Sequence, residues 1–163
     1  MGVVRLGVPE ELALTLKETF GLSTFVETGT YKAGSTVWAS NHFSRVVTIE
    51  GFEEYFRRAI AAHGHRQNVE FLFGDSRQKL PEVLRTLQEP AIFWLDAHWM
   101  GNKEISAGTD RECPLLDEIA YLMDSSIDHY ILIDDARLFG EEHRDAPNRE
   151  WPSSESSDRK SVV

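Results

Sequence analysis

The sequence has 163 residues, 41% of them hydrophobic and 27% charged, and a formal net charge of −10 at pH 7. This length suits about one domain, and the acidic balance disfavours nucleic acid as a partner. The single cysteine, Cys113, excludes an internal disulfide and a multi-cysteine zinc site. No apolar run approaches the ~20 residues of a membrane span, and no signal-peptide pattern is present, so we expect a cytoplasmic protein.

Helical and strand patterns alternate along most of the chain. A first helix is predicted from Pro9 to Phe20, where proline suits the opening turn and Gly21 ends the helix. The predicted strands are Phe25–Gly29, Arg45–Glu50, Val69–Phe73, Ala91–Asp96 and Tyr130–Asp134. The helices that connect them are predicted over Ser35–Phe43, Phe52–His63, Arg77–Gln88 and Cys113–Met123. This alternation predicts an α/β fold, a Rossmann-like open and mostly parallel sheet with helices on both faces.

A loop containing Gly29 and Gly34 joins the first strand to the next helix. Glycine at these points allows a sharp turn and a close approach to a ligand, and such a unit is typical of nucleotide-type sites in open sheets. The spacing does not fit the dinucleotide pattern G-x-G-x-x-G. A phosphate loop is also disfavoured, because Ser35 stands where that motif needs a lysine.

Each predicted strand ends with or beside an acidic residue. These residues are Glu27, Glu50, Asp75, Asp96 and Asp134. The carboxyl ends of parallel strands lie along one edge of a sheet, so we expect the carboxylates to gather there. Glu50 lies where an acidic residue can accept hydrogen bonds from ribose hydroxyls. Asp75 is open to a second interpretation, since it precedes a helix and could cap it.

The last two predicted strands end in the segments Asp96-Ala-His98 and Asp134-Asp135. These supply several carboxylate oxygens and one imidazole. Hard oxygen ligands suit Mg²⁺, Mn²⁺ or Ca²⁺, and clustered carboxylates without a cation would repel one another. The two segments therefore predict a site for a divalent metal ion.

The arrangement Glu27-x-Gly29-x-x-x-x-Gly34-Ser35 resembles the first motif of class I S-adenosylmethionine (SAM)-dependent methyltransferases. The acidic ends of the last two strands add to this resemblance. It is most similar to the metal-dependent sugar O-methyltransferases of the macrocin type. The resemblance covers residues 25 to 135 and implies SAM as cofactor, with the loop around its methionine part and Asp75-Ser76 near its adenine. The implied cofactor-binding residues are Glu27, Gly29, Thr30, Tyr31, Gly34, Ser35, Glu50, Asp75, Ser76 and Asp96.

The same resemblance implies Asp96, Asp134 and Asp135 as metal ligands. His98 falls where that family has a second aspartate, so either His98 or Asp96 is the catalytic base. The implied reaction begins when the metal lowers the pKa of a substrate hydroxyl and the base removes its proton. The oxygen then attacks the methyl group of the sulfonium. The implied substrate is a hydroxyl of a small molecule or sugar, and a catechol-like diol is the chemical alternative.

The alternating pattern stops after Phe139, which divides the chain into a methyltransferase-like domain, 1–139, and a polar, serine-rich tail, 140–163. The resemblance implies a further helix and two further strands, so we expect a sheet without its last strands. The strand ending at Asp134 would then be an edge that can pair with a second copy in a homodimer. Two other functions are open: a non-catalytic SAM- or nucleotide-binding module, such as a shortened pseudoenzyme, and a metal-dependent hydrolase. The hydrolase ranks last because Glu27 disfavours a phosphate in the loop.

Overall fold

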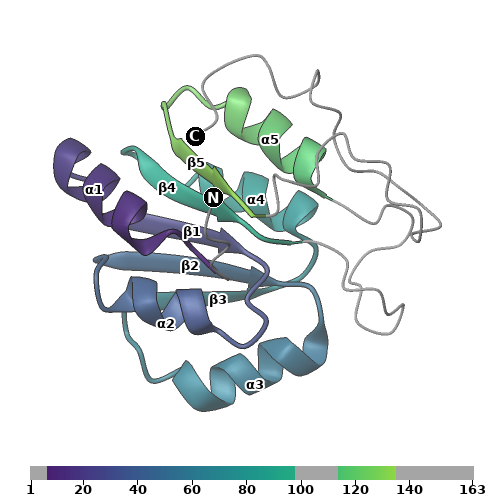
Figure 1. The fold of residues 1–163 in the computed structure, drawn as a ribbon. Helices are drawn as coiled ribbons and strands as arrows, with labels where there is room; N and C mark the ends of the chain where they lie inside the picture. Colours follow the sequence, from purple (N-terminus) through teal and green to yellow (C-terminus); the bar gives the residue numbers. More distant parts are fainter. Residues whose placement is uncertain (1–6, 98–113, 135–163) are drawn as a thin grey trace, which may run out of the picture.

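The computed structural model describes residues 7–97 and 114–134 (Figure 1). Within them, the chain forms a five-stranded sheet in the order β3-β2-β1-β4-β5, and every neighbouring pair is parallel. The strands are β1 (Thr24–Thr28), β2 (Arg45–Glu50), β3 (Val69–Phe73), β4 (Ala91–Leu95) and β5 (Tyr130–Ile133). The predicted α/β fold with an open parallel sheet is confirmed.

Helices cover both faces of this sheet, as Figure 1 shows. They are α1 (Glu10–Phe20), α2 (Gly34–Ser40), α3 (Glu53–His63), α4 (Ser76–Leu84) and α5 (Leu115–Met123). Right-handed crossovers place α2 and α3 on one face and α4 and α5 on the other. Side chains of α1 and α2 share a core with Phe25 and Val46, whereas those of α4 and α5 pack with Val26 and Val47.

Strands β1 and β4 are buried along their whole length. A central strand that helices cover on both faces needs apolar side chains at nearly every position. This explains why Ala91–Leu95 is apolar throughout. Strand order reverses between β1 and β4, since β2 and β3 lie on one side and β5 on the other. The carboxyl ends of β1 and β4 therefore flank the topological switch point, where open α/β sheets bind ligands.

Two predicted helices end earlier than the sequence suggests. The helix predicted over Ser35–Phe43 ends at Ser40, because the N–H groups of His42 and Phe43 both bond to the Ala39 carbonyl and the turn closes. The helix predicted over Arg77–Gln88 runs from Ser76 to Leu84. The hydroxyl of Thr86 and its N–H both bond to the Val83 carbonyl, which ends the regular helix.

Several predictions concern residues outside 7–97 and 114–134. These are the metal-site residues His98 and Asp135, the first residue of the helix predicted from Cys113, and the tail over 140–163. The boundary between a domain at 1–139 and that tail stays a prediction. None of the described helices has the length and apolar character that a membrane crossing needs.

Candidate functional site

Gly29 follows β1 and adopts a left-handed backbone conformation with φ of +87°. A Cβ atom placed there would lie 2.6 Å from the carbonyl oxygen of Asp96, the residue that follows β4. Glycine is therefore required because two backbones meet at the switch point. The close approach seen at Gly29 is to the chain's own backbone at Asp96, and the expected approach to a ligand stays a prediction.

Gly34 has a different role from the one the sequence suggests. A Cβ atom there would meet nothing within 4 Å, and its φ lies outside the left-handed region. The prediction that this glycine makes a sharp turn is wrong, because the left-handed residues after Gly29 are Tyr31 at +48° and Ala33 at +60°. Gly34 is simply the first residue of α2.

Glu27 lies inside the protein, fully buried between β1 and α2. Its carboxylate accepts hydrogen bonds from the hydroxyls of Ser35, Thr36 and Thr48. Burial raises the pKa of Glu27 to about 7, the three hydrogen bonds oppose this, and the charge of Asp96 adds to it. The resemblance implied that Glu27 binds the cofactor, whereas the structure encloses its carboxylate and uses it to tie the loop to α2.

Glu50, at the end of β2, holds the loop from the other side. Its two carboxylate oxygens accept hydrogen bonds from the backbone N–H groups of Tyr31 and Phe52, each at 2.8 Å. Tyr55 of α3 packs edge-on against the rings of Tyr31 and Phe52. Each oxygen of Glu50 keeps a second lone pair, so the carboxylate can still accept hydrogen bonds from a ligand.

Thr30 extends the same network. Its hydroxyl lies 2.6 Å from that of Thr48, which in turn donates to Glu27 at 2.8 Å. Thr30, Thr48 and Glu27 are all buried. The loop is thus connected to β1, β2 and α2 through side chains that lie next to one another only after folding.

Asp75 is the N-cap of α4, so the capping interpretation is confirmed. Its carboxylate accepts the backbone N–H of Arg77 at 2.9 Å and three contacts of 2.6–3.0 Å from the Arg77 guanidinium. Burial alone would raise the pKa of Asp75, but the hydrogen bonds and charge of Arg77 outweigh it and hold the pKa below its ordinary value. Ser76, the other predicted adenine contact, is buried as the first residue of α4.

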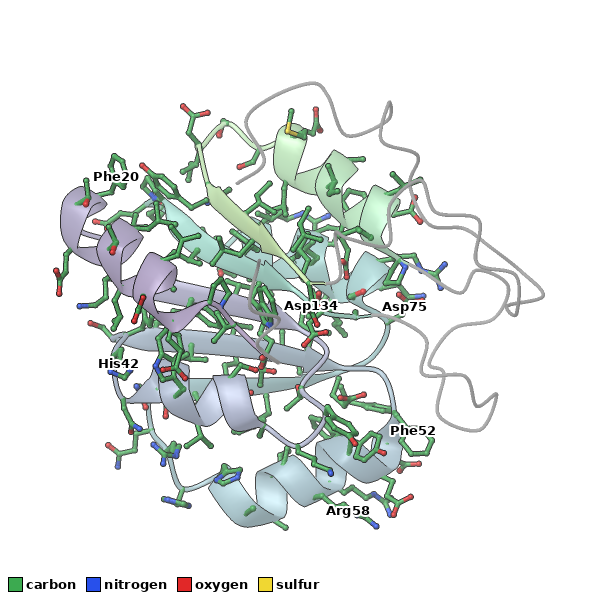
Figure 2. The ribbon with its side chains drawn as sticks, in the orientation of Figure 1. Phe20, His42, Phe52, Arg58, Asp75 and Asp134 are labelled. Atoms are coloured by element: carbon green, nitrogen blue, oxygen red, sulfur yellow. The ribbon has the colours of Figure 1, made fainter. Side chains whose placement is uncertain are left out.

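Asp96 and Asp134 follow neighbouring strands and extend their ladder. The N–H of Asp96 bonds to Thr28, and that of Asp134 bonds to Leu95, each at 3.0 Å. In Figure 2, Asp75 and Asp134 lie toward the arrowhead ends of the strands, as the parallel sheet requires. The described residues contain no group of three or more acidic, histidine or cysteine side chains placed to hold a metal ion. His98 and Asp135 lie outside them, so the metal site stays a prediction.

Glu118 of α5 is a buried acidic residue outside the set predicted from sequence. It is 1% exposed, and neither carboxylate oxygen has a hydrogen-bond partner within the described part of the chain. Burial raises its pKa to about 7, and the nearby hydroxyls of Ser76 and Thr28 offset this only in part. Its helical spacing from the buried residues Leu115 and Leu122 was the available signal, because it puts a carboxyl on the apolar face of the helix.

No family model and no curated protein matches this sequence. Solved structures do resemble the fold. The O-methyltransferase TomG from Streptomyces achromogenes, in complex with SAM, is 20% identical with a TM-score of 0.54, covering 75% of this chain and 52% of that one. The methyltransferase PaMTH1 from Podospora anserina, bound to S-adenosylhomocysteine (SAH), is 18% identical with a TM-score of 0.52, covering 76% and 50%.

A third similar structure is the 23S rRNA methyltransferase ErmE, which is 13% identical with a TM-score of 0.51, covering 80% of this chain and 48% of that one. This chain thus spans about half the length of the structures it matches. At these identities the likeness establishes the Rossmann-like open α/β fold. The substrate differs among proteins that share it, so the fold does not identify one.

Proposed function

We propose that this chain is a SAM-dependent O-methyltransferase that acts on a hydroxyl group of a small molecule or sugar. The observation that carries the proposal is the joint placement of the glycine loop and Glu50 at the switch point between β1 and β4. The two similar structures that hold SAM or SAH share this sheet architecture.

The residues present fit SAM in three respects. Gly29 lets the loop turn against the backbone of Asp96 at the switch point, and Glu50 presents acceptors suited to ribose hydroxyls. The loop residues Thr30, Tyr31, Gly34 and Ser35 would surround the methionine part. Glu27 would act by holding Ser35 in place, because its carboxylate is enclosed.

When bound, SAM supplies a methyl group on a positively charged sulfur. The chain would align a substrate oxygen with that methyl group and remove the hydroxyl proton. Asp96 and His98 are the two candidates for the base. A histidine suits this role near neutral pH because its ordinary pKa lies close to 6.5.

Metal assistance of the macrocin type is part of the proposal. Asp96 and Asp134 come directly after adjacent parallel strands, which supports a shared oxygen site, and Asp135 would be the third ligand. A divalent cation such as Mg²⁺ would supply Lewis-acid stabilisation of negative charge on the substrate oxygen. Titration of Mn²⁺, followed by water-proton relaxation, tests this site. Asp134→Ala should lose the binding, whereas Asp124→Ala, an exposed residue of the same charge, should keep it.

We also propose that the protein is cytoplasmic and forms a homodimer through β5, which is an edge of the sheet within the described residues. Sedimentation equilibrium at several protein concentrations tests the dimer. A single species of monomer mass at every concentration would exclude it.

Calorimetric titration of SAH into the purified protein tests the cofactor site. Glu50→Ala should weaken binding at least about tenfold, because hydrogen bonds to a charged group contribute about 1.5–3 kcal/mol. Glu54→Ala is the matched control, since Glu54 is exposed on α3 and pairs with Arg58. No binding by the wild-type protein would refute the proposal. Binding without transfer of a labelled methyl group to any hydroxyl substrate would favour the non-catalytic binding module.

A further inference from the structure

The edge of the sheet opposite β5 carries an apolar surface. Within the described residues no strand pairs with the outer side of β3, and α3 lies beside it (Figure 1). Phe73 of β3 is 46% exposed, and its ring packs against that of Phe56 of α3 at 5.2 Å between centroids. Ile60, 42% exposed, lies one turn further along the same face of α3, and the half-buried Phe71 shares the face of β3 with Phe73. We call these four residues the β3 edge surface.

The backbone of β3 offers hydrogen-bonding groups to a further strand. The carbonyl of Asn68, directly before β3, accepts the N–H of Val46 at 2.8 Å and therefore faces β2. The backbone groups of successive residues in a strand point to opposite sides, so those of Phe71 and Phe73 point away from β2. The outer side of β3 thus presents a row of donors and acceptors next to the apolar surface.

β3 lacks the features that keep a free edge from pairing. Natural edge strands are protected by proline, by lysine, by a bulge or by a very short length. β3 is the five-residue segment Val69-Glu-Phe-Leu-Phe73, which has neither proline nor lysine and pairs with β2 in unbroken register. Its one charged side chain, Glu70, forms an ion pair with Arg45 of β2 at 3.3 Å. The strand is therefore suited to accept another strand.

The charges at the two ends of α3 favour a second copy of this chain as the occupant. The first turn of α3 contains Glu53 and Glu54, whereas its last turn contains His63, and Arg66 follows in the loop to β3. A two-fold axis beside Phe71 would make the two β3 strands antiparallel, and with them the two α3 helices. The acidic end of each helix would then lie toward the basic end of the other, and the opposed helix dipoles would also attract.

We propose that two copies of this chain associate through antiparallel pairing of their β3 strands, which joins the two sheets into one. Phe71 faces Phe71 of the second copy, and the two residues exchange N–H to carbonyl hydrogen bonds. Phe73 faces Val69 of the second copy and covers apolar surface there. Glu70 faces Leu72 of the second copy, so like charges are not placed opposite one another. This interface is separate from the one proposed at β5 and does not depend on the proposed enzymatic function.

Sedimentation equilibrium at several protein concentrations measures the association. Phe73→Lys should weaken it at least about tenfold, because the variant loses apolar area and puts a charge that must stay hydrated on the edge. Ile60→Lys, on α3 and outside the sheet, should weaken it in the same direction. Leu116→Lys is the matched control, since Leu116 is also 46% exposed but lies on α5, and it should leave the association through β3 unchanged.

Amide hydrogen exchange followed by NMR locates the contact. The N–H of Phe71 should exchange more slowly as the wild-type concentration rises, because pairing satisfies it only in the associated form. The N–H of Glu70 faces β2 and should be protected at every concentration. In Phe73→Lys the concentration dependence at Phe71 should be lost. A dimer formed through β5 alone would leave the exchange of Phe71 independent of concentration, which separates the two interfaces.

The results that would overturn the inference are specific. They are a wild-type protein that is monomeric at every concentration, an association that Phe73→Lys and Ile60→Lys both leave unchanged, and exchange at Phe71 that does not depend on concentration. Circular dichroism verifies that each variant is folded. If Phe73→Lys does not fold, Ile60→Lys carries the test, because its side chain is exposed on a helix and takes no part in the ladder between β2 and β3.

Discussion

Replacement of Glu118 by glutamine should change the difference in free energy of unfolding between variant and wild type. This difference should favour the variant more at high pH than at low pH. Burial raises the pKa of Glu118 from 4.5 to about 7. The folded state thus binds this proton more tightly than the unfolded state. Below pH 4.5 the carboxyl is neutral in both states and carries no penalty, whereas above about pH 7 the folded protein must bury a charge.

The size of the effect follows from the pKa. Since one pKa unit corresponds to about 1.4 kcal/mol, a rise from 4.5 to about 7 gives about 3 kcal/mol. The wild-type free energy of unfolding should fall by this amount, relative to Glu118→Gln, between about pH 4.5 and pH 8. Any constant cost of the buried amide cancels when the two pH values are compared. Glu27, which titrates in the same window, is present in both proteins and also cancels.

Urea unfolding of both proteins at pH 4.5 and pH 8, followed by circular dichroism, measures the difference. Asp124→Asn is the control, because that exposed carboxyl should produce no comparable pH dependence. If the stability difference between wild type and Glu118→Gln were the same at both pH values, Glu118 would have an ordinary pKa. The account of its burial would then be wrong.

Three further effects can be measured in the same way. Gly29→Ala should destabilise the protein by at least about 1–3 kcal/mol, because of its φ of +87° and the Cβ contact with Asp96. Gly34→Ala should be tolerated, and equal losses in the two variants would contradict this assignment. Burial lowers the pKa of His129, partly offset by Asp128, and its Nδ1 accepts the N–H of Ala91. Its contribution to stability should be complete above the unfolded pKa of about 6.5 and lost as pH falls, whereas a pKa at or above 6.5 by NMR would refute this.

The strands were predictable from sequence because each is a short segment rich in β-branched and aromatic residues, separated from the next by a helical pattern. Arg45–Glu50 and Val69–Phe73 agree with the prediction at both ends. Helix ends were less predictable, since the early end of α2 depends on hydrogen bonds to Ala39 that helical periodicity does not encode.

The site was predictable in its location and less so in its contacts. Parallel topology brings Glu50 and Asp134 to one edge of the sheet, as the acidic strand ends suggested. The enclosure of Glu27 depends on Thr48, which is 21 residues away in the chain. The spacing of Glu118 from Leu115 and Leu122 could place it on the apolar face of α5, but its neighbours Thr28 and Ser76 belong to two other elements that only folding brings together.

The loop after β1 is fixed before any ligand binds, because three separate elements hold it. Gly29 packs on the backbone at Asp96, Tyr31 bonds to Glu50, and Thr30 is linked to Glu27 through Thr48. Left-handed conformations at non-glycine residues cost energy and persist only where the surroundings impose them. A loop held in this way need not be ordered at the moment of binding, which removes part of the entropic cost of association. Substitutions at Glu27 should therefore weaken ligand binding chiefly by loosening the loop.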